Sequence, residues 1–172
     1  MASLIENLID TLEKENTEYG KLLELSKKKS SVVVSRDIPA LEKITDEEQI
    51  VVSAISTLDA KRAEVTKDIA NVLNKDVESL TLSALISMLG KSPSEQSRLS
   101  AVHDRLKTTV TALRTLNESN RQLIDQSKEM VEFDLNMIRS MRQAPETNNY
   151  GRSAVSVGGT LGTGMRGFDA KQ

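Results

Sequence analysis

Three glycines near the end of the sequence have the spacing of a dinucleotide-binding loop. Gly162, Gly164 and Gly167 spell G-x-G-x-x-G. In dinucleotide-binding folds a strand leads into this loop, and the N-terminus of the helix that follows holds the pyrophosphate. No buried strand is indicated before these glycines, and the five residues after Gly167 are too few for a helix. Because Met165 also stands where a phosphate-binding P-loop requires lysine, we expect no nucleotide site here.

The other residues that could do chemistry are few or scattered. The sequence has no cysteine and one histidine, His103, which excludes thiolate catalysis and multi-histidine metal sites. Acidic residues at 45–49 indicate a solvated helix face, and the segment at 134–137 lacks the glycine and the distant glutamate of a calcium loop. We expect His103 to be an ordinary residue at a helix surface. The sequence therefore predicts a protein that is not an enzyme, with no catalytic residue, no metal and no cofactor.

The composition narrows the class of protein further. The 172 residues include 23 Lys and Arg against 25 Asp and Glu, and this balance gives no reason to expect a nucleic-acid partner. No secretory signal is indicated, and no apolar segment approaches the roughly 20 residues of a membrane span. Aromatic residues make up only 2% of the chain, so the core must be aliphatic. We expect a cytoplasmic protein of long amphipathic helices, without direct membrane insertion.

Apolar residues recur at three- and four-residue steps over long stretches, which is the period of an α-helix. They predict helices at about 4–34, 38–74, 82–89 and 93–142. The expected fold class is all-α: an elongated helical bundle or antiparallel coiled coil of three long helices and one short helix.

The same pattern predicts the domain organisation. Residues 1–142 are expected to form one helical domain. Residues 143–172 hold six of the eight glycines and have no helical period, so we expect them to form a flexible, disordered tail.

Local signals mark where the helices begin. Ser3 with Glu6 has the pattern of a capping box, and Asp37 and Thr81 stand where the second helix and the short helix need N-caps. Several polar residues nevertheless occupy or adjoin the apolar stripes: Glu15, Glu48, Arg62, Asn117, Asn120 and Ser127.

The end of the last helix carries more apolar surface than one packing face needs. At about 100° per residue, the apolar residues of "MVEFDLNMIRSM" (130–141) spread over about 200°, whereas a helix that faces one core needs about 100°. Three of the six methionines lie here, and flexible thioethers suit surfaces that accept varied apolar partners. Two interpretations stay open. The methionines fill the core at the end of the bundle, or they form a groove that binds an amphipathic helix of a partner.

Four segments, taken in order, carry a resemblance to a known family. They are the opening "LIDTLEKENTEYGKLLELSKKKSSVVVSRDIPALEKITDEEQ", the insert "LTLSALISML", the stretch "NRQLIDQSKEMVEFDLNMI" and the tail "YG…FDAKQ". Together they span nearly the whole chain. In this order they resemble the FlgN family of flagellar export chaperones, which serve the hook-filament junction proteins.

The resemblance implies an α-helical, non-enzymatic chaperone of the cytoplasm. Such proteins bind the C-terminal amphipathic helices of the hook-associated proteins, prevent their aggregation or degradation, and deliver them to the flagellar type III export gate. The family's client contacts lie in its C-terminal helical region. Here that region implies Leu123, Ile124, Met130, Val131, Met137, Ile138 and Met141.

The resemblance also implies a second contact site. In the family a Tyr-Gly pair after the last helix docks to the cytoplasmic domain of the export gate, and Tyr150 and Gly151 stand at that place. The sequence then departs from the family's pattern, with a longer Gly-rich tail that ends in "GFDAKQ".

A structural coiled-coil adaptor or scaffold without an export client is the alternative. It predicts that the apolar arc at 130–141 is buried in the chain's own bundle or in a homodimer, whereas the chaperone hypothesis predicts that this arc is exposed. The sequence leaves homo-oligomerisation open, because an open amphipathic helix can pair with itself as easily as with a client.

Overall fold

The chain folds into helices joined by short connections. The computed structural model describes residues 2–143, and its elements are α1 (Ala2–Ser35), α2 (Ile38–Leu73), α3 (Leu82–Met88), the 3-10 turn η1 (Leu89–Lys91) and α4 (Pro93–Gln143). The predicted all-α fold of three long helices and one short helix is confirmed, and residues 2–143 contain no strand. The tail is predicted to span residues 143–172. Gln143 is the last residue of α4, and residues 144–172 lie outside the described residues.

The chain divides into two compact units, Met1–Asp134 and Leu135–Gln172. The first unit holds α1, α2, α3 and the part of α4 that ends at Asp134. The described part of the second unit is the C-terminal part of α4, residues 135–143.

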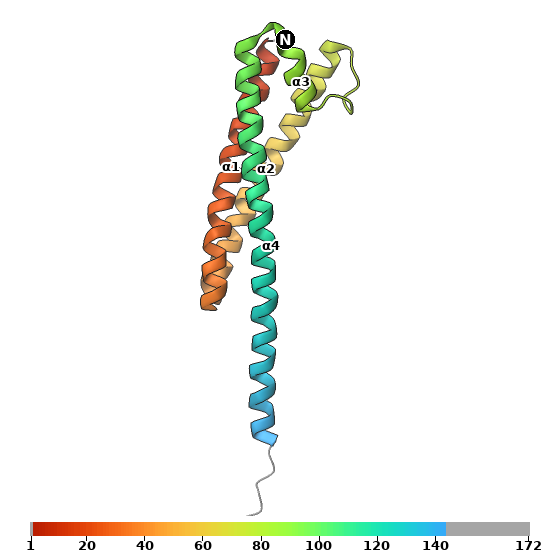
Figure 1. Cartoon of the computed structure of the whole chain (residues 1–172). Helices are drawn as coiled ribbons and strands as arrows, with labels where there is room; N and C mark the ends of the chain where they lie inside the picture. Colours follow the sequence, from red (N-terminus) through yellow and green to blue (C-terminus); the bar gives the residue numbers. More distant parts are fainter. Residues whose placement is uncertain (1, 144–172) are drawn as a thin grey trace, which may run out of the picture. The chain divides into compact units, whose positions relative to one another are not determined.

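The helices α1 and α2 form an antiparallel hairpin (Figure 1). Glu15 of α1 pairs with Arg62 of α2, and Lys29 of α1 pairs with Glu48, so the partners run in opposite directions along the two helices. The turn between them is short because Arg36 takes the left-handed conformation, with φ 56°. Asp37 then caps α2.

Two predicted N-caps are confirmed. The side chain of Asp37 accepts a hydrogen bond from the amide of Ala40, and the side chain of Thr81 accepts one from the amide of Ala84. Each oxygen satisfies an amide of the first turn that has no partner within its helix.

Within the first unit α4 runs parallel to α1. Arg98 of α4 donates to the carboxylate of Glu6 at 2.8 Å, and further along both helices Ser30 donates to the side chain of Asn120 at 2.5 Å. The predicted capping box of Ser3 and Glu6 is wrong, because α1 already begins at the residue before Ser3. The Glu6 carboxylate instead accepts a charge-assisted bond from another helix.

The main core lies at the end of the first unit where α3 packs. One aliphatic cluster joins all four helices there, and its members are Ile5, Leu8, Ile9, Leu12, Val65, Ile69, Ala70, Leu80, Leu85, Leu99 and Val102. None of these residues is aromatic, as the composition predicts. In Figure 1, α3 lies beside the C-terminal end of α2 and the N-terminal end of α4.

Candidate functional site

Four of the predicted client-binding residues lie on α4 within the first unit. Leu123 and Ile124 are half-buried, whereas Met130 and Val131 are exposed. Ile124 and Val131 line one groove in the surface, and Met130 is not among the residues that line it. The structure therefore brings two of these four side chains into a common hollow.

The other three predicted residues lie in the second unit. Met137, Ile138 and Met141 have 43%, 49% and 69% of their surface exposed. Across 130–141 the described side chains are exposed at every position. Tyr150 and Gly151, the residues predicted to dock to the export gate, lie outside the described residues.

The groove runs between α2 and α4 in the first unit, with α1 as its floor. Two adjoining hollows of about 340 and 530 Å³ form it, and Ile124 lines both. The residues of its two walls recur at helical steps: Ile38, Leu41, Glu48 and Val52 on α2, and Asn117, Arg121, Ile124, Lys128 and Val131 on α4. Since these steps keep each set on one face of its helix, the two faces oppose each other across the groove.

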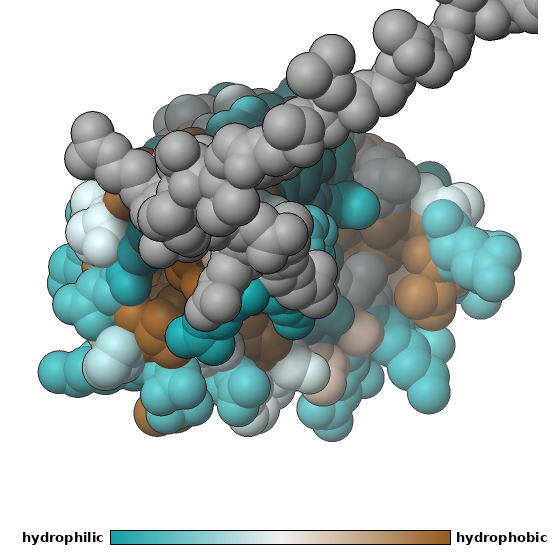
Figure 2. Space-filling model, turned by 90° about the horizontal axis from the view of Figure 1, so that it is seen from below, coloured by the Kyte–Doolittle hydropathy of each residue, from teal (hydrophilic) through white to brown (hydrophobic). Residues whose placement is uncertain are grey.

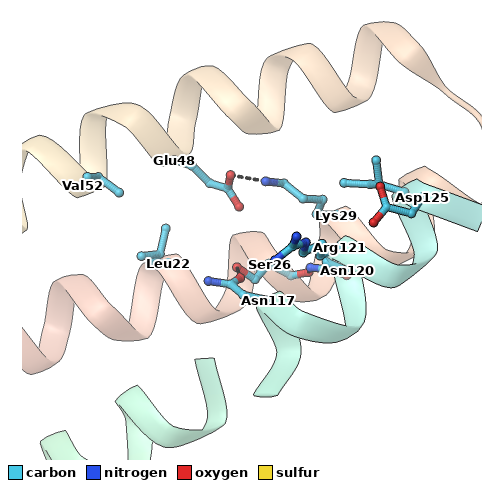
Figure 3. Close-up of a pocket in the computed structure, with 10 residues that line it drawn as sticks. Leu22, Ser26, Lys29, Glu48, Val52, Asn117, Asn120, Arg121 and Asp125 are labelled. Carbon is cyan, nitrogen blue, oxygen red and sulfur yellow. Dashed lines mark hydrogen bonds and ion pairs between the residues drawn. The ribbon is translucent and has the colours of Figure 1, made fainter. Parts of the chain in front are cut away.

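One half of the groove is polar (Figure 3). Lys29 and Glu48 form an ion pair with side-chain exposures of only 19% and 15%. Ser26 donates a hydrogen bond to the side chain of Asn117 at 3.1 Å, and the buried Asn120 donates to the carbonyl of Ser26 at 2.8 Å. Glu48, Asn117 and Asn120, which interrupt the apolar stripes, therefore pair with polar groups of α1.

The other half of the groove is apolar and lies next to the turn between α1 and α2. Its apolar lining is Val32, Val33, Ile38, Leu41, Ile124 and Val131. Ile38 is 59% exposed and Val131 is 44% exposed, so two large aliphatic side chains face solvent across the same hollow. Figure 2 shows brown apolar residues that reach the surface between teal hydrophilic residues.

A second ion pair lies on the hairpin, away from the groove. The side chain of Glu15 is only 3% exposed and accepts a hydrogen bond from Nε of Arg62 at 3.0 Å. Burial raises the pKa of Glu15 above its ordinary value, because the loss of water outweighs the opposing effect of the Arg62 guanidinium. Burial acts to lower the pKa of Arg62, but the charges and hydrogen bonds of Glu15 and Asp59 outweigh it, and this pKa is raised.

The described residues bear on the predictions about metal binding and the single histidine. No group of three or more His, Asp or Glu side chains within them could hold a metal ion. His103 is half-buried, and its Nδ1 lies 3.1 Å from a carboxylate oxygen of the adjacent Asp104. Of the helices in residues 2–143, none combines the length and the apolar character that crossing a membrane requires.

Sequence reasoning missed the wall that α2 contributes. Ile38 and Val52 were not predicted to have a functional role, yet both are exposed and line the groove. A signal for Val52 exists in the sequence: it is an aliphatic residue directly after Val51, which already occupies the apolar stripe of this helix. An apolar residue beside a complete stripe widens the apolar face, as the surplus at 130–141 does.

Comparison with known proteins gives one family. The family model described as FlgN protein matches residues 1–157. A search of curated proteins and a search of solved structures each found no match.

Proposed function

Because the chain belongs to the FlgN family, we propose that it is a cytoplasmic chaperone for flagellar hook-associated proteins. The match to residues 1–157 supports a role in flagellar export in general. The finer proposal is that the chain binds the C-terminal amphipathic helices of these clients, prevents their aggregation or degradation, and delivers them to the export gate. The role needs no catalytic group and no cofactor.

One observation carries the proposal of client binding. Large apolar side chains from Met130 to Met141 are exposed on a helix whose other residues are mostly charged or polar. Exposed apolar surface of this extent is typical of binding sites, because a monomer gains nothing by keeping it in water. A client terminus that buries its own apolar stripe only on assembly needs a cover of this kind before export.

A binding measurement tests the proposal. Peptides that correspond to the C-terminal helices of the hook-associated proteins should bind the full chain with 1:1 stoichiometry in isothermal titration. The double variant Met137→Asp, Met141→Asp should lose at least tenfold in affinity while its helical circular dichroism is unchanged, since both side chains are exposed. If the unmodified chain binds none of these peptides, it is not a chaperone for these clients.

Delivery to the export gate is a separate part of the proposal. Tyr150 and Gly151 match the family's docking pair in sequence. Tyr150→Ala should weaken binding to the cytoplasmic domain of the export gate and leave client affinity unchanged. Equal losses of both activities would indicate misfolding and argue against a docking role.

A further inference from the structure

The short helix α3 fills the space between α2 and α4 at one end of the first unit. Leu85 of α3 is buried in one cluster with Ile69 of α2 and Leu99 of α4. The side chain of Gln96 on α4 also donates a hydrogen bond to the carbonyl of Ile86 at 2.9 Å. At this end α3 therefore acts as a fourth helix, which closes the core of the three long helices.

The corresponding space at the other end is the open groove. The same three long helices bound it, but no segment within residues 2–143 covers it. Its α4 wall extends from 117 to 131, which at 1.5 Å per residue is about 21 Å, and its α2 wall, from 38 to 52, has the same length. A helix of about four turns matches that length.

We propose that this groove holds one partner helix, which completes a four-helix arrangement here as α3 does at the other end. The inference rests on the proposed function, because the occupant is taken to be the C-terminal amphipathic helix of an export client. It adds that α2 provides half of the binding site, through Ile38, Leu41 and Val52. Client contacts on α4 alone would leave these side chains without a role.

The two halves of the groove define the chemistry of the occupant. About two turns of the partner helix pack an apolar stripe against the aliphatic half, at Ile38, Leu41 and Val131. The remaining turns present polar side chains to Asn117 and Arg121 in the polar half. A helix that was apolar along its full length would cover Asn117 and Arg121, which are exposed in the free chain, without offering their side chains hydrogen bonds.

The charges that line the groove support the same partner. Four cations and four anions contribute to its lining: Lys29, Arg36, Arg121 and Lys128 against Asp37, Glu48, Asp125 and Glu132. A lining without net charge attracts neither nucleic acid nor a strongly charged peptide. It is complementary to a helix whose polar flanks carry balanced charge, and binding should change little with salt concentration.

Three exposed aliphatic residues of α2 allow a matched test. Ile38 and Val52 line the groove, whereas Ile50 lines a different hollow, beside Gly20 and Glu24 of α1. Ile38, Val52 and Ile50 are 59%, 51% and 72% exposed, so aspartate at each position should leave the fold intact. With the C-terminal helix peptides as probes, Ile38→Asp and Val52→Asp should each weaken binding at least tenfold. Ile50→Asp should stay within twofold of the unmodified chain.

The outcomes of this test separate the inference from the proposed function. If all three variants bind the peptides as the unmodified chain does, α2 is not part of the site, although the chain is still a chaperone. If the unmodified chain binds no peptide, the proposed function fails and the inference fails with it. If the chain forms dimers without peptide and Val52→Asp abolishes them, the occupant is a second copy and the inference is overturned.

Disulfide trapping gives a second measurement of where the partner helix binds. The experiment is possible because the chain has no cysteine of its own. Leu41 of α2 lines the groove, and Glu47 of α2 lines the hollow that contains Ile50. With a peptide that carries one cysteine in its apolar stripe, Leu41→Cys should cross-link at least ten times faster than Glu47→Cys. Equal rates would overturn the inference.

Discussion

The two ends of the first unit use the same three long helices but differ in what lies between α2 and α4. At the α3 end, aliphatic side chains such as Leu85 and Leu99 are fully enclosed. At the end with the turn between α1 and α2, the space is open and half of its lining is polar. The difference teaches that packing at the α3 end stabilises the fold, whereas the other end can accept a further helix without rearrangement of the three long helices.

The polar half of the groove explains how the open end persists without a partner. The Lys29–Glu48 ion pair and the bonds of Asn120 to Ser26 and Ser30 hold the helices together, yet they also tolerate water. An aliphatic lining of the same length would form a larger apolar patch, which favours aggregation. The polar contacts therefore limit the exposed apolar area to the hollow beside the turn.

The largest expected effect contrasts core side chains of the two ends. Leu99 is 0% exposed at the α3 end, and Leu99→Ala should lower the free energy of unfolding by about 2–5 kcal/mol, since it leaves a cavity. Val131 lies in the open groove, and Val131→Ala should change that free energy by less than about 0.5 kcal/mol. Urea denaturation of both variants measures the difference. Similar losses would mean that the two ends do not differ in packing.

A buried polar residue sharpens the comparison at the open end. Asn120 is 3% exposed, donates to the carbonyl of Ser26 and accepts from the hydroxyl of Ser30. Asn120→Ala removes this donor and this acceptor and should cost about 1–3 kcal/mol. Asn117, one turn away and exposed, makes a single hydrogen bond to Ser26, and Asn117→Ala should cost less than about 1 kcal/mol. Equal costs in urea denaturation would argue that these polar contacts do not hold α1 to α4.

The sequence predicts local features of the fold but does not predict contacts between helices. The helix stripes, the N-caps Asp37 and Thr81 and the polar interruptions are local features, and each follows from the residue types and their spacing. The pairing of Glu15 with Arg62 spans 47 positions and depends on the register between two helices, which one sequence does not reveal. The same holds for the groove, because whether Val52 is covered depends on how far α3 extends over the long helices.

The capping box of Ser3 and Glu6 shows how a local signal can fail. The spacing fits a reciprocal pair of caps, but α1 begins at Ala2 and so includes Ser3, and the Glu6 carboxylate accepts two bonds from Arg98 at 2.8 Å. Since Arg98 lies on α4, nothing near Ser3 in the sequence could reveal this partner.

A substitution at a glycine between the two ends should change the stability of the chain without changing its affinity for peptides. Gly20 lies inside α1, and a Cβ built there meets no atom within 4 Å. Gly20→Ala should therefore raise the free energy of unfolding by up to about 1 kcal/mol through helix propensity alone. It should leave peptide affinity unchanged, because Gly20 does not line the groove between α2 and α4. A loss of stability in thermal denaturation would mean that this part of α1 is packed more tightly than the structure indicates.

The smallest expected effect concerns the buried carboxylate of the hairpin. Because the pKa of Glu15 is raised in the folded state, the folded chain binds a proton more tightly than the unfolded chain does. Ionisation of Glu15 therefore lowers the free energy of unfolding as the pH rises from the unfolded pKa through the folded pKa. Glu15→Gln keeps an acceptor for Arg62 and removes this titration, so its stability relative to the unmodified chain should increase from about pH 4 to about pH 7. The difference in unfolding free energy between the two chains, measured by urea denaturation across that range, removes the contribution of the titrating groups that they share. A relative change in the opposite direction would show that the ion pair with Arg62 outweighs burial and that the hairpin is stabilised by its charges.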